Sequence, residues 1–242
     1  GKNLKKFIVD DSHLNFKSIN GVLFNKVGNE LICYPMNKEE TYYFINENVT
    51  TISKDAFTGN LNLKTLIIPD NVISLKESAI SNMKELTTLI FETKITTSFT
   101  CQTDPFTNNT KLTQIIVRQD IDTTSICSTK IPINNTYGIS IGTNSWYIYE
   151  EESKYLFIYG NGIIKDYTEI EPNTWGGKNK EIRNMKMKDI TGIGSYVFST
   201  LTNFEMISLP ESVTQIGDYL FAGNKKVKQI EIGSQVNQIG NN

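Results

Sequence analysis

The apolar residues of this chain recur at a fixed spacing of 23 positions. Two successive segments, VTTISKDAFTGNLNLKTLIIPDN from Val49 and VISLKESAISNMKELTTLIFETK from Val72, carry apolar residues at matching positions. Neither segment shows the strict alternation of a half-buried strand or the sustained three-and-four spacing of an amphipathic helix. Another pair of copies begins at Ile190 and Val213, again 23 residues apart. The pattern therefore indicates a repeated structural unit.

Each unit contains three apolar residues spaced as L-x-x-L-x-L. This triplet occurs seven times, beginning at Leu4, Leu63, Leu86, Leu112, Ile182, Phe204 and Val227. A period of about 20–29 residues with this triplet is the signature of a leucine-rich repeat solenoid. One coil cannot enclose its own apolar side chains, so coils must stack to bury them. We predict an α/β leucine-rich repeat solenoid, right-handed and strand-rich, in which the triplets build one parallel sheet on the concave face.

The other apolar positions predict the remaining sides of each coil. Pro69 and Pro210 follow the last triplet residue, and proline tends to mark a strand end because it cannot donate to a ladder. Residues Val49–Ile52 should form the next side. Ala56 and Phe57 should lie on a short helical turn that packs inward. One repeat is then one circuit of a flattened coil.

Two segments interrupt the repeats and are expected to be β-rich insertions docked on the edges of the array. The first, at about 12–46, contains GVLFN and ELICY around Gly28–Asn29, which is a hairpin signal. The second has aromatic strands on both sides of the polar turn Glu150–Ser153. The predicted organisation is a repeat block at 1–128 with the hairpin insertion, a β-rich insertion at 129–181, and a second repeat block at 182–242 that is truncated at its C-terminus.

The units LKTLIIPDNVISLKESAI and FEMISLPESVTQIGDYLF resemble the BspA-like leucine-rich repeats of bacterial and protist surface proteins. The similarity is greatest at Leu63–Ala79 and Phe204–Phe221, and it departs at Val197 and Leu220, where the family pattern has alanine. The resemblance implies a non-enzymatic adhesion module that binds host-surface or extracellular-matrix proteins. It also implies an extracellular, cell-surface location.

Composition and charge narrow the range of functions. The net charge is −2 and the basic residues are scattered, which argues against a nucleic-acid partner. The apolar runs are too short to span a bilayer, so we expect no membrane insertion within this chain. His13 is the single histidine, and no nucleophile motif such as G-x-S-x-G accompanies it. We therefore predict no catalytic residues, no metal and no cofactor.

Two alternatives to an adhesion module stay open. Trp146 and Trp175 in the aromatic insertion could stack on a sugar, which would make the chain a carbohydrate-binding or enzymatic module. The repeats could also form a passive stalk that displays other domains.

Two cysteines share one repeat position. Cys101 lies six residues after Ile95, and Cys127 lies six residues after Ile121. Equivalent positions on adjacent coils are about 5 Å apart, a distance that suits a disulfide. The alternative is that both cysteines lie in loops that do not stack.

The residues between the inward triplet positions predict a binding face, because they project from the opposite side of the sheet. An exposed apolar stripe bordered by polar groups is typical of interaction sites. Two other interpretations remain: β-branched residues simply favour strands, or the first insertion covers the stripe. The candidate protein-binding residues are the central Ile67, Ile90 and Ile116 with their neighbours Thr65, Thr88 and Gln114.

Overall fold

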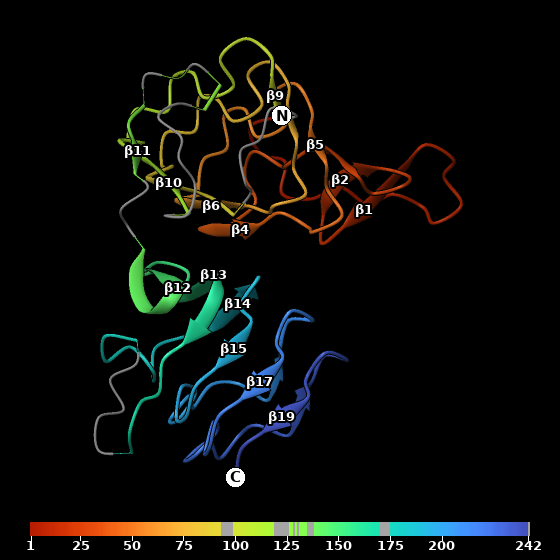
Figure 1. The fold of residues 1–242 in the computed structure, drawn as a ribbon. Coiled ribbons are helices and arrows are strands. Elements are labelled where there is room, and N and C mark those ends of the chain that lie inside the picture. Colours follow the sequence, from red (N-terminus) through yellow and green to blue (C-terminus); the bar gives the residue numbers. More distant parts are fainter. Residues whose placement is uncertain are drawn as a thin grey trace. The chain divides into compact units, whose positions relative to one another are not determined.

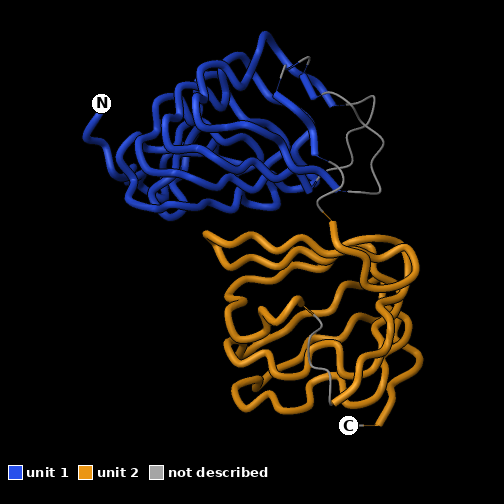
Figure 2. Tube along the Cα trace, turned by 90° about the vertical axis from the view of Figure 1, so that its left-hand side faces the viewer, with its two compact units in different colours: residues 1–137 blue, residues 138–242 orange. Residues whose placement is uncertain are grey.

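The computed structural model describes residues 1–92, 99–118, 126–127, 129, 131–134, 138–169 and 175–241. The chain divides into two compact units, unit 1 at residues 1–137 and unit 2 at residues 138–242 (Figure 2). Each unit is a stack of coils that contribute short strands to parallel sheets. The predicted block boundaries at 128 and 181 remain a prediction.

The described residues of unit 1 form two sheets, and successive coils contribute neighbouring strands to them (Figure 1). The strand orders are β1-β2-β3-β5-β7-β9 and β11-β10-β8-β6-β4. The 23-residue repeat sets the register, so that Ile52 lies opposite Leu75 and Leu66 lies opposite Leu89. The strands are β1 (Phe16–Ile19), β2 (Val22–Asn25), β3 (Glu30–Cys33), β4 (Tyr42–Phe44), β5 (Thr51–Ile52), β6 (Thr65–Ile68), β7 (Ser74–Leu75), β8 (Thr88–Phe91), β9 (Thr100–Cys101), β10 (Ile115–Val117) and β11 (Ile133–Asn134).

Unit 2 begins with a long antiparallel hairpin and continues as parallel coils. Its main sheet has the order β12-β13-β15-β17-β19, β14 pairs with the other part of β13, and β16 pairs with β18. Figure 1 shows β15, β17 and β19 as successive arrows toward the C-terminus. The strands are β12 (Ile139–Glu150), β13 (Tyr155–Ile164), β14 (Asn184–Lys188), β15 (Gly192–Ile193), β16 (Met206–Ser208), β17 (Gln215–Ile216), β18 (Gln229–Glu231) and β19 (Gln238–Ile239).

The inward positions of the repeat form the cores, as the spacing predicts. In unit 1 the residues in phase with the repeat are fully buried, and in unit 2 the equivalent residues form a second core. Fully burying an aliphatic or aromatic side chain stabilises a fold by about 1.5–3 kcal/mol, so these rows hold the coils together. Examples are Val49, Ile52, Phe57, Leu63 and Leu66 in unit 1, and Ile190, Val197, Phe198 and Val213 in unit 2.

The prediction that one sheet holds all seven triplets is wrong. The triplets beginning at Leu63, Leu86 and Leu112 end in β6, β8 and β10, which are neighbours in one parallel sheet. The triplet at Ile182 ends in β14, and the middle residues of the last two triplets, Ile207 and Ile230, lie in β16 and β18. The β12–β13 hairpin explains the break, because β13 takes the place of a coil strand beside both β14 and β15.

The predicted helical turn at Ala56–Phe57 is also wrong, and the residues that the structure describes contain no helix. Asp55 has a φ of 57°, a left-handed conformation that a right-handed helix cannot contain. The amides of Asp55 and Phe57 donate to the carbonyls of Glu77 (3.2 Å) and Ala79 (2.9 Å) on the next coil. The segment is therefore a third hydrogen-bonded side of the coil, and the fold is all-β. Ala56 and Phe57 do pack inward.

Both predicted hairpins are present. In the first, Phe24 lies opposite Leu31 across a turn in which Gly28 has a φ of 91°. Its strand β3 pairs with β5 in parallel, so this segment extends the sheet of the coils and supplies its first strands, β1, β2 and β3. In the second, the turn after β12 is closed by the Ser153 amide, which donates to the Glu150 carboxylate at 2.7 Å.

An asparagine precedes the triplet by three residues in four of the repeats. The Nδ2 of Asn60 donates to the carbonyls of Pro35 (2.9 Å) and Met36 (3.2 Å) on the preceding coil. Its Oδ1 accepts from the amides of Asn62 (3.0 Å) and Leu63 (2.8 Å). A buried polar group without a partner is costly, so this side chain fixes the turn that leads into the strand. The four residues are Asn60, Asn109, Asn179 and Asn224.

Candidate functional site

The structure brings the six predicted face residues of unit 1 together. Ile67 lies opposite Ile90, and Ile90 lies opposite Ile116, in the parallel strands β6, β8 and β10. Thr65 lies opposite Thr88 in the same register. Gln114 immediately precedes β10, and its Oε1 accepts a hydrogen bond from the Nδ2 of Asn134 at 3.0 Å. The six residues therefore form one ordered surface of a sheet.

The expectation that this isoleucine row is exposed is wrong. The exposed fractions of Ile67, Ile90 and Ile116 are 1%, 0% and 3%, and Thr65 is also buried. None of the three isoleucines belongs to the inward core of unit 1, so their burial arises on the outward side of the sheet. Sequence spacing gives the direction of a side chain along a strand, but it does not show what lies over that face.

One residue of this row was missed by the sequence reasoning. Phe44 in β4 lies opposite Ile67 and extends the row by one strand. Its segment was interpreted as part of an insertion, although Phe44 precedes Ile67 by 23 residues and so obeys the repeat. The repeat offset was therefore the signal that could have found it.

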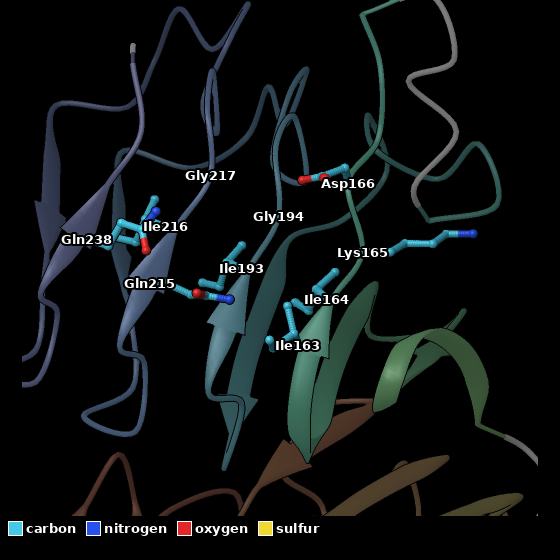
Figure 3. Close-up of a pocket in the computed structure, with 10 residues that line it drawn as sticks. All are labelled: Ile163, Ile164, Lys165, Asp166, Ile193, Gly194, Gln215, Ile216, Gly217 and Gln238. Carbon is cyan, nitrogen blue, oxygen red and sulfur yellow. The ribbon is translucent and has the colours of Figure 1, made fainter.

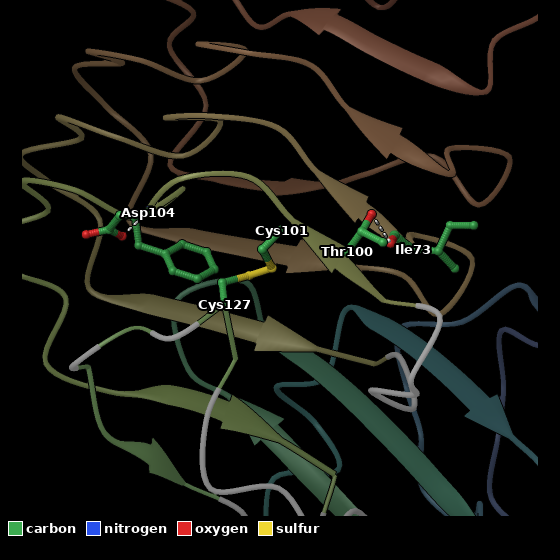
Figure 4. The surroundings of a disulfide bond; sticks show 6 residues. Ile73, Thr100, Cys101, Asp104 and Cys127 are labelled. Atoms are coloured by element: carbon green, nitrogen blue, oxygen red, sulfur yellow. Dashed lines mark hydrogen bonds between the residues drawn. A yellow bond between two sulfur atoms is a disulfide. The ribbon is translucent and has the colours of Figure 1, made fainter.

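A disulfide joins Cys101 to Cys127, with 5.2 Å between their Cα atoms (Figure 4). Cys101 lies opposite Leu75, so it occupies the inward row of Ile52 and Leu75. Ile95 and Ile121, from which the sequence spacing is counted, lie outside the described residues. Among the described residues, β9 is the terminal strand of its sheet, and the bridge links it to the segment that contains Cys127. Cys33 is a free thiol whose pKa is raised by burial, which lowers its fraction of nucleophilic thiolate.

A groove lined by polar side chains and isoleucines crosses the strands of unit 2 (Figure 3). One row of its lining comes from equivalent positions of four strands: Ile163, Gly192, Gln215 and Gln238. The next turn adds Lys165, Asp166, Gly194 and Gly217, and the groove encloses about 260 Å³. The corner glycines allow the coils to approach closely, because a Cβ at Gly217 would lie 2.5 Å from the Ser195 amide nitrogen.

The corner beside this groove is held by side chains that accept backbone hydrogen bonds. The Ser195 amide donates to Oδ1 of Asp166 (2.7 Å), and the Asp218 amide donates to Oγ of Ser195 (3.2 Å). The Asn241 amide donates to Oδ1 of Asp218 at 2.7 Å. These bonds tie each coil to the preceding one and leave a carboxylate at the surface of two of the coils.

The two tryptophans of the carbohydrate-binding alternative lie in different surroundings. Trp175 is fully buried, stacks on Phe198 at 6.0 Å between ring centroids, and meets Tyr147 edge-on at 5.3 Å. It therefore belongs to the core. Trp146 is half-buried and stacks on Tyr159.

The remaining predicted features are placed as follows. His13 lies in an exposed loop, where its Nδ1 accepts from the amides of Asn15 (3.2 Å) and Phe16 (3.1 Å). In the part of the chain that the structure describes, no group of three or more His, Cys, Asp or Glu side chains is arranged to hold a metal ion. Within the same residues, no helix has the length and apolar character needed to cross a membrane.

Comparison with known families and structures gives consistent matches. The family model for the BspA type leucine rich repeat region matches residues 33–145 and 163–242, in six copies. No curated protein matches the chain.

Several solved structures are similar to this chain. A leucine-rich repeat protein from Eubacterium ventriosum is 21% identical with a TM-score of 0.43, covering 94% of this chain and 54% of that one. The pneumococcal vaccine antigen PcpA is 15% identical with a TM-score of 0.34, covering 94% and 50%. A leucine rich cell surface protein from Faecalibacterium prausnitzii is 16% identical with a TM-score of 0.26, covering 83% and 45%. The chain thus spans about half the length of these proteins.

Proposed function

Because the chain belongs to the BspA type leucine-rich repeat family, we propose that it is a non-enzymatic protein-interaction module of the cell surface, which adheres to host-surface or extracellular-matrix proteins. Stacked repeats suit this role, since each coil adds a few side chains to an extended surface that contacts a partner at many points. The fold alone does not identify the partner.

The observation that supports an extracellular location is the Cys101–Cys127 disulfide. Disulfides form and persist in oxidising compartments and are rare where glutathione and thioredoxin keep thiols reduced. Here the bridge begins at β9, the last described strand of its sheet.

Within unit 1, the proposed contact surface is the sheet face that carries the six candidate residues. Thr88 and Gln114 are half-buried and provide hydroxyl and amide groups that a partner can reach. Ile67, Ile90 and Ile116 project from the same face but are buried, so the contact is proposed for Thr88 and Gln114 alone.

The test is direct binding of the purified, oxidised chain to immobilised extracellular-matrix proteins and to labelled surface proteins of host cells, measured by interferometry. We expect saturable binding that Thr88→Ala with Gln114→Ala weakens. Lys54→Ala, which removes an exposed ion pair with Glu77 elsewhere in unit 1, is the matched control. A folded chain that binds none of these proteins would instead be the passive stalk.

A further inference from the structure

Two tyrosines stand at one corner of successive coils in unit 2. Tyr196 and Tyr219 occupy the same repeat position, 23 residues apart. Their rings stack with 5.2 Å between centroids and an interplanar angle of 26°. Tyr219 is 47% exposed, Tyr196 is half-buried, and neither belongs to the apolar core of the unit. We call these two residues the tyrosine pair.

The backbone beneath the tyrosine pair is fixed by the neighbouring coils. The Tyr196 amide donates to the Asp218 carbonyl (3.0 Å), and the Tyr219 amide donates to the Asn241 carbonyl (2.7 Å). The φ angles of the two tyrosines are 59° and 51°, a left-handed conformation that is uncommon for bulky side chains. The rings are thus presented at the corner by a backbone that each adjacent coil holds in place.

Negative charge surrounds the tyrosine pair. Burial, followed by the nearby Glu169 carboxylate, the Tyr219 ring and the Asp218 carboxylate, raises the pKa of Tyr196. Asp166 lies on the preceding coil at the same corner, where its Oδ1 accepts from the Ser195 amide. Figure 3 shows that the Lys165 side chain points away from Asp166 and from the groove. Among the described residues, this corner therefore combines the two aromatic rings with the carboxylates of Asp166, Glu169 and Asp218.

The chain already contains one example of the interaction that this corner favours. The Nζ of Lys165 lies 5.3 Å from the centroid of the Tyr167 ring, and Tyr167 occupies the equivalent position one coil earlier. The face of an aromatic ring attracts a cation, and arginine or lysine within about 6 Å of the centroid is stabilised by it. An adjacent carboxylate adds a charge-assisted hydrogen bond.

We propose that the tyrosine pair, together with Asp166, Glu169 and Asp218, binds an arginine- or lysine-rich segment of a partner protein. This inference rests on the proposed interaction function and specifies the chemistry of one partner. The charge of the corner favours a basic peptide over a neutral sugar, whose hydroxyl groups could donate to the carboxylates but which carries no positive charge to balance theirs.

The test uses the full chain and a synthetic peptide of alternating arginine and glycine as the probe, with affinity measured by titration calorimetry at low salt. The double variant Tyr196→Ser with Tyr219→Ser places serine at both corner positions, as unit 1 has at its equivalent Ser78. It should raise the dissociation constant about tenfold. Tyr196→Phe with Tyr219→Phe should retain binding, because the ring faces remain. Asp218→Asn should weaken it about threefold while keeping the Oδ1 acceptor for the Asn241 amide.

The controls separate the aromatic corner from general electrostatics. Asp55→Asn removes a carboxylate in unit 1 at the repeat position that corresponds to Tyr219, and it should leave the affinity unchanged. A peptide of alternating glutamine and glycine should not bind, and rising salt should weaken the arginine peptide. The proposal is overturned if the double serine variant binds the arginine peptide as tightly as the unchanged chain. It is also overturned if a neutral chitin oligosaccharide, and not the peptide, loses affinity in that variant. Loss of matrix-protein binding with peptide binding intact would contradict only the broader function.

Discussion

Units 1 and 2 build their coils on the same inward rows but place different chemistry at the same corner. Ile52 and Leu75 in unit 1 correspond to Ile193 and Ile216 in unit 2, and all four are buried. Three residues further on, unit 1 has Asp55 and Ser78, whereas unit 2 has Tyr196 and Tyr219. All four corner residues have a left-handed backbone, with φ between 51° and 59°. The inward side chains and the coil-to-coil hydrogen bonds therefore set the backbone, and the corner side chain can change its chemistry without altering it.

The two units also differ in how their coils are locked together. Unit 1 has a disulfide between coils and an asparagine, Asn60, whose polar atoms are all bonded. Unit 2 has the long β12–β13 hairpin, which pairs directly with β14 and β15. In unit 2, the Oδ1 of Asn179 has no hydrogen-bond partner among the described residues. The same repeat is thus stabilised by different interactions in the two units. Each of these interactions can be removed separately by substitution.

The largest effect is expected from removing an inward aromatic ring. Phe57→Ala in unit 1 and Phe198→Ala in unit 2 should each cost about 3–5 kcal/mol of unfolding free energy, since both rings are fully buried. Both tryptophans lie in unit 2, so tryptophan fluorescence follows that unit while far-ultraviolet circular dichroism follows both. Phe198→Ala should shift the fluorescence transition in denaturant, and Phe57→Ala should not. An equal shift in both variants would show that the units unfold as one.

Removing the disulfide should have the next largest effect, and only on unit 1. A bridge across a sequence separation of 26 lowers the conformational entropy of the unfolded chain and thereby stabilises the folded state by about 3.5 kcal/mol. Cys101→Ser with Cys127→Ser should lower the stability measured by circular dichroism and leave the tryptophan transition in place. Cys33→Ser is the matched control, because that thiol is unpaired and half-buried. A double variant as stable as the control would contradict a structural role for the bridge.

A smaller difference is expected between equivalent asparagines. Asn60→Ala leaves the buried amides and carbonyls that it bridges without partners and should cost about 2 kcal/mol. Asn179 donates only to the Ser199 carbonyl and the Thr200 hydroxyl, so Asn179→Ala should cost about 1 kcal/mol. Denaturant titrations of the two variants give the comparison. Equal costs would mean that the position matters and the number of hydrogen bonds does not.

The smallest change in stability should come from the tyrosine pair itself. Tyr196→Ser with Tyr219→Ser removes one half-buried and one exposed ring from positions where unit 1 already has short polar residues. We expect a change in the tryptophan transition within about 0.5 kcal/mol, which is typical of surface substitutions. A loss of several kilocalories would show that the stacked rings are part of the fold of unit 2.

The inward rows could be predicted from the sequence because each row repeats along the chain at a fixed offset. Leu63, Leu66 and Ile68 are buried as their spacing predicts, and β6 pairs with β8 in the expected register. The helical turn could not be judged in this way. The apolar pair Ala56–Phe57 suits a helix or an inward bend equally, and the left-handed φ of Asp55 decides between them.

The outward residues were harder to interpret. The burial of Ile90 depends on what packs over its face of the sheet, and the repeat spacing does not predict which segment that is. The tyrosine pair was accessible from the sequence, since Tyr196 and Tyr219 are separated by one repeat. The triplet positions do not include these tyrosines, because the tyrosines lie on another side of the coil.

The disulfide also limits how far the chain can be stretched. Under tension, the residues between Cys101 and Cys127 cannot contribute to the extended length while the bridge is intact, because the force passes through the sulfur atoms. At about 3.4 Å for each residue of a sequence separation of 26, the bridge shortens the fully extended chain by on the order of 80 Å. A protein at a surface that is pulled by flow would therefore have a shorter reach when oxidised than when reduced.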